Sequence, residues 1–159
     1  MSLYTLSSSP ITCLKYVEGS WAQPNGPETL IKSPYSNQTI GRLNETTKND
    51  LNIIVQAAES AQKNWAQIPI KERSLVLFHF RELLLKNLMH ISERISSECG
   101  KTQQEAAAEI HKGVEVIEFA LSIQNLDVGG KAEVSRGVHC EYRREPLGVV
   151  AAITPFNFP

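Results

Sequence analysis

The chain has 159 residues, enough for one domain or for part of a larger one. Its 42% hydrophobic and 21% charged content is typical of a soluble globular chain, and its net charge of −1 gives no electrostatic reason to expect nucleic acid or an anionic membrane as a partner. No apolar run approaches the roughly 20 residues of a membrane span, and three cysteines without CxxC spacing favour reduced thiols and a cytoplasmic location.

Short strands separated by turns are predicted for the first 45 residues, after a mobile tail at residues 1–10. The first strand turns through Gly19, and clusters rich in Pro, Asn and Gly separate it from the other two. The three predicted strands are 15–22 (with the turn at Gly19), 29–31 and 39–43. We expect them to form a small antiparallel unit.

Three helices are predicted next, because apolar residues recur at a spacing of three to four. Thr47 and Thr102 each begin a capping box, with Asp50 and Glu105 three residues later, and Gly100 is a natural helix stop. The predicted helices start at Thr47, Ile70 and Thr102, and the second continues to Cys99. The second helix carries so much apolar surface that we expect packing on more than one of its faces.

A hairpin and a buried strand are predicted for the remaining residues. Apolar and polar residues alternate over 138–143, and 132–134 is placed to pair with this strand across the turn at 135–137. The apolar run 149–153 suits a parallel strand covered on both faces, and Pro155 ends it. Asn157 is then expected just past the carboxyl end of a strand, the edge at which open α/β sheets bind ligands.

Residues 144–150 (REPLGVV) and 153–159 (ITPFNFP) resemble the aldehyde dehydrogenase superfamily, and the resemblance extends more weakly over nearly the whole chain. It implies an α/β fold that forms the N-terminal part of a much longer enzyme. Small antiparallel strands, three helices, an oligomerisation hairpin and the first strand of a Rossmann-like sheet are expected. The implied divisions are 1–127 for the strands and helices of the NAD(P)-binding domain, 128–146 for the hairpin and 147–159 for the truncated first strand.

The resemblance also implies functional residues. In this family the Asn at the position of Asn157 stabilises the oxyanion that forms when an aldehyde is attacked, and the positions of Ile153, Thr154, Pro155 and Phe156 line the NAD(P) groove. The alternatives are that Asn157 only caps a turn and that the four preceding residues only end a strand.

The nucleophilic Cys and the Glu that the family needs are expected downstream of this chain. We therefore interpret Cys13 in the tail, Cys99 at a helix end and Cys140 on the hairpin as ordinary thiols. No metal is assigned, because the four histidines show no paired ligand spacing. They are His79, His90, His111 and His139.

Residues 99–102 and 109–120, with the Phe156 form of the turn, are most similar to the methylmalonate-semialdehyde dehydrogenase branch. That branch oxidises malonate or methylmalonate semialdehyde with NAD and transfers the acyl group to coenzyme A. It usually has Arg at the position of Lys112, where the side chain helps to hold the substrate carboxylate. Lys offers a point charge instead of a bidentate fork, and a solvated helix lysine is an equally good interpretation. Branches acting on lactaldehyde or glyceraldehyde-3-phosphate stay open.

The sequence therefore predicts NAD- or NADP-dependent oxidation of a small-molecule aldehyde by the full-length enzyme, with coenzyme A as a candidate co-substrate. A homodimer or homotetramer is expected, with no nucleic-acid or membrane partner. This chain alone is expected to be inactive. The alternative is a truncated, non-enzymatic module that associates through its hairpin or its apolar second helix.

Overall fold

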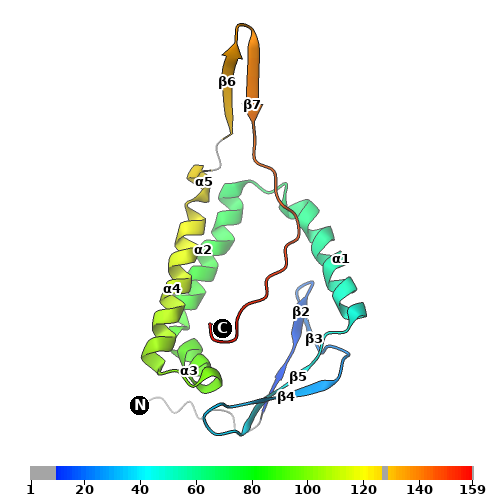
Figure 1. Cartoon of the computed structure of the whole chain (residues 1–159), viewed down its shortest axis with the longest axis vertical. Helices are drawn as coiled ribbons and strands as arrows, with labels where there is room; N and C mark the ends of the chain where they lie inside the picture. The colour runs from blue at the N-terminus through cyan, green and yellow to red at the C-terminus, as the bar shows by residue number, and fades with distance from the viewer. Residues whose placement is uncertain (1–9, 127–128, 159) are drawn as a thin grey trace.

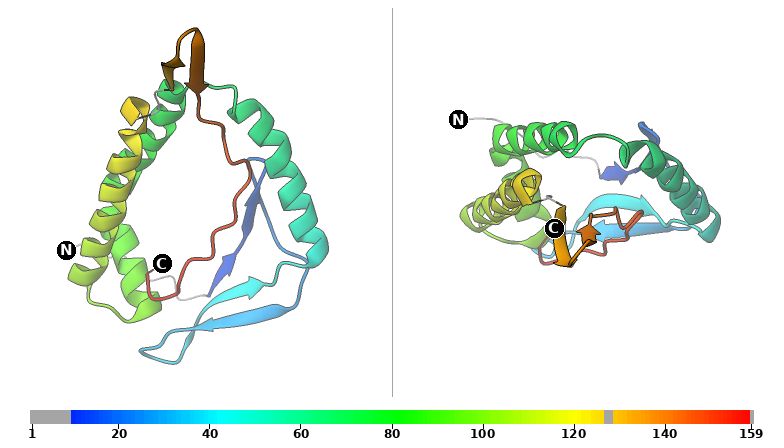
Figure 2. Two further views of the ribbon diagram at one scale, coloured as in Figure 1. Left: turned by 45° about the horizontal axis from the view of Figure 1, so that its top comes forward. Right: turned by 90° about the horizontal axis from the view of Figure 1, so that it is seen from above.

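The computed structural model describes residues 10–126 and 129–158, which form a mixed α/β structure. Its helices are α1 (Lys48–Trp65), α2 (Ile70–Lys86), α3 (Leu88–Cys99), α4 (Gln103–Leu121) and the short α5 (Ile123–Leu126). Its strands are β1 (Ile11–Cys13), β2 (Lys15–Val17), β3 (Ser20–Ala22), β4 (Glu28–Lys32), β5 (Thr39–Asn44), β6 (Gly130–Ser135) and β7 (Val138–Tyr142). In Figure 1 and Figure 2, α2 and α4 lie side by side, whereas α1 stands apart from them on the other side of the C-terminal segment.

The N-terminal strands form two small sheets instead of one antiparallel unit. The pairs β2–β3 and β4–β5 are antiparallel, as the turns predicted, but β1 lies parallel to β5 in the order β1-β5-β4. The prediction that Cys13 belongs to a tail was wrong, because Cys13 pairs with Leu43 in this sheet. A strand of three residues is too short to show a recognisable alternation of apolar and polar residues, so the sequence alone does not reveal it. Residues 1–9 of the predicted tail lie outside the described residues.

A buried carboxylate ties these strands to α1. Asp50 is 1% exposed and accepts hydrogen bonds from the Lys15 ammonium, from the Asn25 amide (2.7 Å) and backbone N–H (3.2 Å), and from the Thr47 hydroxyl (2.8 Å). Thr47 and Asp50 also complete the predicted capping box at the start of α1. Lys15 and Thr47 hold the pKa of the Asp50 carboxyl well below its usual range, against the opposing effect of burial.

The predicted second helix is two helices in the structure, separated at Asn87. The Asn87 backbone leaves the helical region (φ −104°, ψ 11°), and its side-chain amide donates to the Leu83 carbonyl at 2.7 Å. This local bond offers the chain an alternative to continuing the helix, as Asn side chains often do. The apolar spacing continues across the break, which is why the sequence pattern did not reveal it.

The core lies between α3 and α4, where Ile95, Ala106 and Ile110 are buried together. Val114 is buried further along α4, so the apolar face predicted for this helix is confirmed. Arg81 of α2 joins α4 through Glu118, with its Nε donating at 2.7 Å. The expectation of packing on several faces of the second helix is not met in this chain, since Leu75, Val76 and Phe78 remain about half exposed. The described residues bring no further element onto that face of α2.

The predicted hairpin is confirmed, and Figure 1 shows β6 and β7 projecting beyond the helices. The predicted strand at 149–153 is wrong for this structure: residues 143–154 contain no strand, Val150 is 74% exposed and Ile153 is 98% exposed. A strand of a parallel sheet needs neighbours for its backbone hydrogen bonds, and the described residues provide none there. Among these residues, no helix has the length and apolar character needed to cross a membrane.

Candidate functional site at the α3–α4 junction

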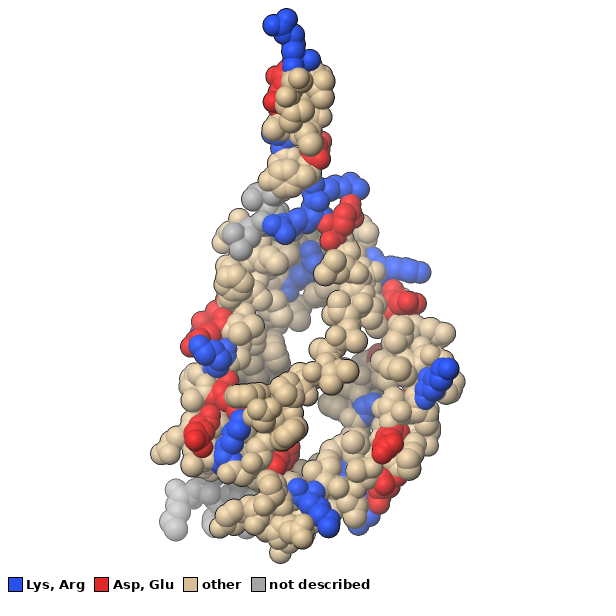
Figure 3. Space-filling model, viewed as in Figure 1, with Lys and Arg blue, Asp and Glu red and all other residues tan. Residues whose placement is uncertain are grey.

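Residues 155–158 form a tight turn at the end of the exposed C-terminal segment. The Phe158 backbone N–H donates to the Pro155 carbonyl at 3.2 Å, and Asn157 is the third residue of this turn. Figure 1 shows the segment running down between the two helical arms and ending beside α3 and α4. It carries no charged residue from Pro146 onward, and Figure 3 shows openings on both sides of it.

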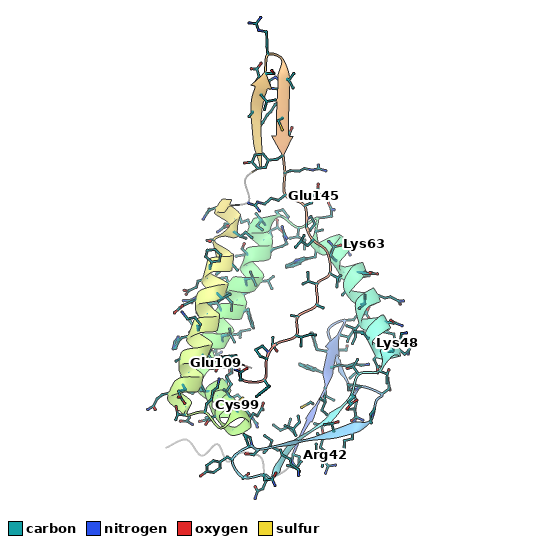
Figure 4. The ribbon with its side chains drawn as sticks, viewed as in Figure 1. Arg42, Lys48, Lys63, Cys99, Glu109 and Glu145 are labelled. Carbon is teal, nitrogen blue, oxygen red and sulfur yellow. The ribbon has the colours of Figure 1, made fainter. Side chains whose placement is uncertain are left out.

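The junction that receives this turn is built by helix-end signals. Gly100 ends α3 in the left-handed conformation (φ 75°), which glycine adopts without strain. Thr102 then caps α4, and its hydroxyl accepts from the Glu105 backbone N–H at 3.2 Å. The Cys99 thiol lies 3.5 Å from the Phe156 carbonyl oxygen. In Figure 4, Cys99 and Glu109 both lie beside the end of the C-terminal segment.

Lys101 lies between Gly100 and Thr102 and joins this junction to the turn. Its ammonium forms an ion pair with Glu109 of α4 and donates to the backbone carbonyl oxygen of Asn157. The same nitrogen lies 4.6 Å from the centre of the Phe158 ring, within the range of a cation–π interaction. Three kinds of contact therefore converge on one side chain, and two of them fall on consecutive residues of the turn.

A groove of about 710 Å³ opens between α4 and the turn. Its lining contains basic, acidic, amide and apolar groups. The lining residues are Lys101, Glu105, Glu109, Lys112, Gly113, Val116, Asn157 and Phe158. Hydrogen bonds from the Thr102 backbone and hydroxyl lower the pKa of Glu105, with a smaller contribution from the charge of Lys101. The groove therefore combines two lysine side chains with the Glu105 carboxylate, whose lowered pKa favours its ionised form.

Two groups of the groove differ in how fully they are paired. Lys112 is 74% exposed and forms an ion pair with Glu115 one turn further along α4. One carboxylate oxygen of Glu109 is occupied by Lys101, whereas the other, Oε1, is buried and has no hydrogen-bond partner among the described residues. A buried acceptor without a donor is uncommon in folded proteins, and it lies here in the lining of a groove.

The structure places Asn157 and Lys112, both predicted from the sequence, on this one groove. It does not bring the other predicted positions, Ile153, Thr154, Pro155 and Phe156, into the lining. Those four residues precede it along the exposed segment. Their roles stay predictions. The described residues contain no cluster of His, Cys, Asp and Glu that would hold a metal ion.

Lys101 and Glu109 were not singled out from the sequence. Both belong to the segments, 99–102 and 109–120, on which the similarity to the methylmalonate-semialdehyde dehydrogenase branch was based. A lysine directly before a helix cap and a glutamate two turns into the helix are eight residues apart, and that spacing alone gives no sign of a contact. The similarity to this branch was therefore the one signal in the sequence that included Lys101 and Glu109, and their contact is seen only in the structure.

The model of the aldehyde dehydrogenase family matches residues 21–159. The chain belongs to the aldehyde dehydrogenase family. It is 36% identical over 158 residues to malonate-semialdehyde dehydrogenase 1 of Geobacillus kaustophilus (strain HTA426), a match that covers 98% of this chain and 32% of the relative. The chain thus spans about one third of the length of the curated relatives that it matches.

Solved structures agree with this assignment. A Sinorhizobium meliloti 1021 protein with a proposed methylmalonate-semialdehyde dehydrogenase activity, solved in complex with NAD, matches with a TM-score of 0.90 and 32% identity over 96% of this chain and 31% of that one. The NADP-dependent glyceraldehyde-3-phosphate dehydrogenase of Bacillus halodurans C-125, solved with NADP, matches with a TM-score of 0.87 and 28% identity. This match covers 93% of this chain and 33% of that one. The predicted family and fold class are confirmed, and members of this family use NAD or NADP.

Proposed function

We propose that this aldehyde dehydrogenase chain forms the N-terminal part of an NAD(P)-dependent enzyme that oxidises malonate or methylmalonate semialdehyde. In this proposal the Asn157 side-chain amide donates a hydrogen bond to the aldehyde oxygen as negative charge develops on it, and Lys112 attracts the substrate carboxylate. Transfer of the acyl group to coenzyme A and assembly into a homodimer or homotetramer belong to the same proposal.

The observation that supports it best is the presence of Asn157 and Lys112 in the lining of one groove. A semialdehyde of this class carries an aldehyde and a carboxylate on a short carbon chain. Its recognition therefore requires a hydrogen-bond donor and a cation that face the same space. A donor placed before the reaction is effective because it needs no reorganisation when the oxyanion forms.

The segment 153–156 suits one wall of a dinucleotide groove. It is uncharged, and its apolar side chains are open, with Ile153 98% and Phe156 91% exposed. These residues fit an apolar contact with a nicotinamide ring, while the described residues show no glycine-rich cradle for the phosphates. When bound, NAD(P) would accept the hydride, and Asn157 would hold the substrate oxygen beside it.

The described cysteines do not supply the expected nucleophile. Cys13 lies in β1, Cys140 is exposed on the hairpin, and Cys99 is half buried with its thiol against the Phe156 carbonyl oxygen. We therefore propose that the purified chain alone produces no NADH from malonate semialdehyde, NAD and coenzyme A. NADH formation above the rate of a no-protein blank would contradict this part of the proposal.

The catalytic proposal is tested by a chimera in which this chain replaces the corresponding third of the Geobacillus kaustophilus relative. We expect NADH formation with malonate semialdehyde, and a decrease in kcat of about 10²- to 10³-fold in Asn157→Ala. Asn52→Ala, on the exposed surface of α1, is the matched control and should retain activity. An active chimera that is insensitive to Asn157→Ala would contradict the role of Asn157.

The exposed apolar face of α2 favours the alternative of an oligomerising module. Its signature would be a defined homo-oligomer of the isolated chain together with an inactive but folded chimera. Size-exclusion chromatography with light scattering, combined with circular dichroism of the chimera, separates the two proposals.

A further inference from the structure

We infer that Lys101 is a positioning residue for Asn157, which it holds in place through the main chain of the turn. The consequence for catalysis rests on the proposed function, whereas the consequence for the turn itself does not. Lys101 is not expected to touch the substrate, because its ammonium is already engaged by Glu109, by the Asn157 carbonyl oxygen and by the Phe158 ring.

The bond from Lys101 to Asn157 leaves the side-chain amide of Asn157 free. Lys101 donates to the backbone carbonyl of Asn157 and not to its side chain. The carboxamide of Asn157 can therefore still donate to a ligand while its backbone is held. The contact with the Phe158 ring fixes the next residue as well, so the two ends of the Asn157–Phe158 peptide are both restrained by one cation.

The ammonium is itself held firmly. Gly100 turns the chain out of α3, Thr102 starts α4, and Lys101 lies between these two fixed points. Glu109 presents its carboxylate from the rigid second turn of α4. The side chains of Lys101 and Glu109 are only 23% and 16% exposed. Partial removal from water strengthens a charge-assisted bond relative to one on the open surface.

The turn needs such a support because the chain leading to it has little. Residues 147–153 form no strand, and Leu147 and Ile153 are almost fully exposed. The turn's own hydrogen bond, from Phe158 to Pro155, sets its shape but not its position on the helices. The thiol contact of Cys99 is weak by nature. The charged contact from Lys101 is therefore the strongest of the described ties between the turn and the α3–α4 junction.

The first test uses the 159-residue chain labelled with ¹⁵N. Backbone order parameters are measured for Asn157 and Phe158, with α4 as the rigid reference. We expect the wild-type turn to approach the rigid value of about 0.85, and Lys101→Met to lower it below about 0.6. Lys101→Arg keeps the charge and the donors and should preserve the order. Lys112→Met, which removes the other lysine of the groove, should leave the turn ordered.

The second test measures kinetics in the chimera. Lys101→Met should lower kcat about 10- to 100-fold while KM for malonate semialdehyde changes less than about twofold, because a displaced donor affects the transition state more than binding. Lys101→Arg should restore most of kcat. A general loss of folding would not produce this separation of kcat from KM or its rescue by Arg.

The outcomes are distinguishable. An order parameter at Asn157 and Phe158 that Lys101→Met leaves unchanged would overturn the inference, as would wild-type values below about 0.6 in the turn. An active chimera whose kcat is insensitive to Lys101→Met would also overturn it. If the unmutated chimera is inactive, the proposed function fails, and the order parameters alone then decide whether Lys101 positions the turn.

Discussion

Two lysine–carboxylate pairs organise different regions of this molecule. Lys15 and Asp50 join the N-terminal strands to α1, and Lys101 and Glu109 join the α3–α4 junction to the C-terminal turn. Each pair is partly or fully removed from water, and each brings together segments that the sequence separates. They differ in what surrounds the carboxylate.

The Asp50 carboxylate is saturated, because the Lys15 ammonium, the Asn25 amide and backbone and the Thr47 hydroxyl and backbone occupy its two oxygens. Glu109 has one oxygen on Lys101 and a second without a partner among the described residues, and it lines a groove. A buried carboxylate whose oxygens are all hydrogen-bonded avoids the cost of unpaired groups, whereas an unsatisfied acceptor lowers stability and remains available to a ligand. The comparison thus separates a structural pair from one that belongs to a site.

The largest predicted effect on stability is at Asp50. Asp50→Asn removes the negative charge opposite Lys15 and disrupts the capping box, so we expect the melting temperature of the chain to fall by roughly 10 °C in a thermal scan at pH 7. Glu105→Gln is the matched control, because Glu105 occupies the same position in the other capping box but is exposed. It should lower the melting temperature by only about 2 °C. Equal effects of the two changes would contradict the proposed distinction between them.

The dependence of stability on pH should also reveal the contribution of the Asp50 carboxylate. The pKa of Asp50 is lower in the folded chain than its ordinary value of 3.8, so its contribution to stability is complete above that value. The contribution is lost as the pH falls toward the lowered pKa of the folded state. We expect the melting temperature of the wild type to fall between about pH 5 and pH 2, and Asp50→Asn to show a clearly shallower fall. Parallel pH profiles for the two proteins would contradict this assignment.

Local signals in the sequence predicted the parts of the fold that depend on near neighbours. Both capping boxes, the stop at Gly100, the hairpin β6–β7 and the buried face of α4 follow from spacing and turn chemistry within a few residues. Asn157 and Lys112 were singled out through the family resemblance and not through local spacing, and the structure places both of them in the lining of one groove.

The features that were missed depend on partners distant in the sequence. The strand β1 exists because β5 lies beside it, and the expected strand at 149–153 is absent because none of the described residues pairs with it. The break at Asn87 depends on one side-chain bond that interrupts an otherwise continuous apolar pattern. Lys101 likewise has an ordinary sequence context, and its importance emerges only when the turn 56 residues later is placed against it.

A smaller effect is predicted for two glycines, Gly100 at the end of α3 and Gly113 within α4. Gly100 has a φ of 75°, so Gly100→Ala should destabilise the junction through backbone strain alone, since an added Cβ would meet Pro34 only at an ordinary 3.6 Å. Gly113 lies inside α4 with open space around it, so Gly113→Ala should stabilise the helix. We expect shifts in melting temperature of about 2–4 °C in opposite directions. Shifts of the same sign would contradict the conformations described for one of these glycines.

The smallest effect tests whether Lys112 senses a substrate carboxylate or is only a solvated lysine. Glu115 pairs with Lys112 on the surface of α4, and such exposed pairs contribute little to stability. Glu115→Gln removes this competitor, so in the chimera KM for malonate semialdehyde should fall about twofold, and KM for propanal, which has no carboxylate, should not change. Lys112→Met should raise KM for malonate semialdehyde and again leave propanal unaffected. If both aldehydes respond alike, the charge of Lys112 does not select the substrate, and the groove would then distinguish aldehydes by shape alone.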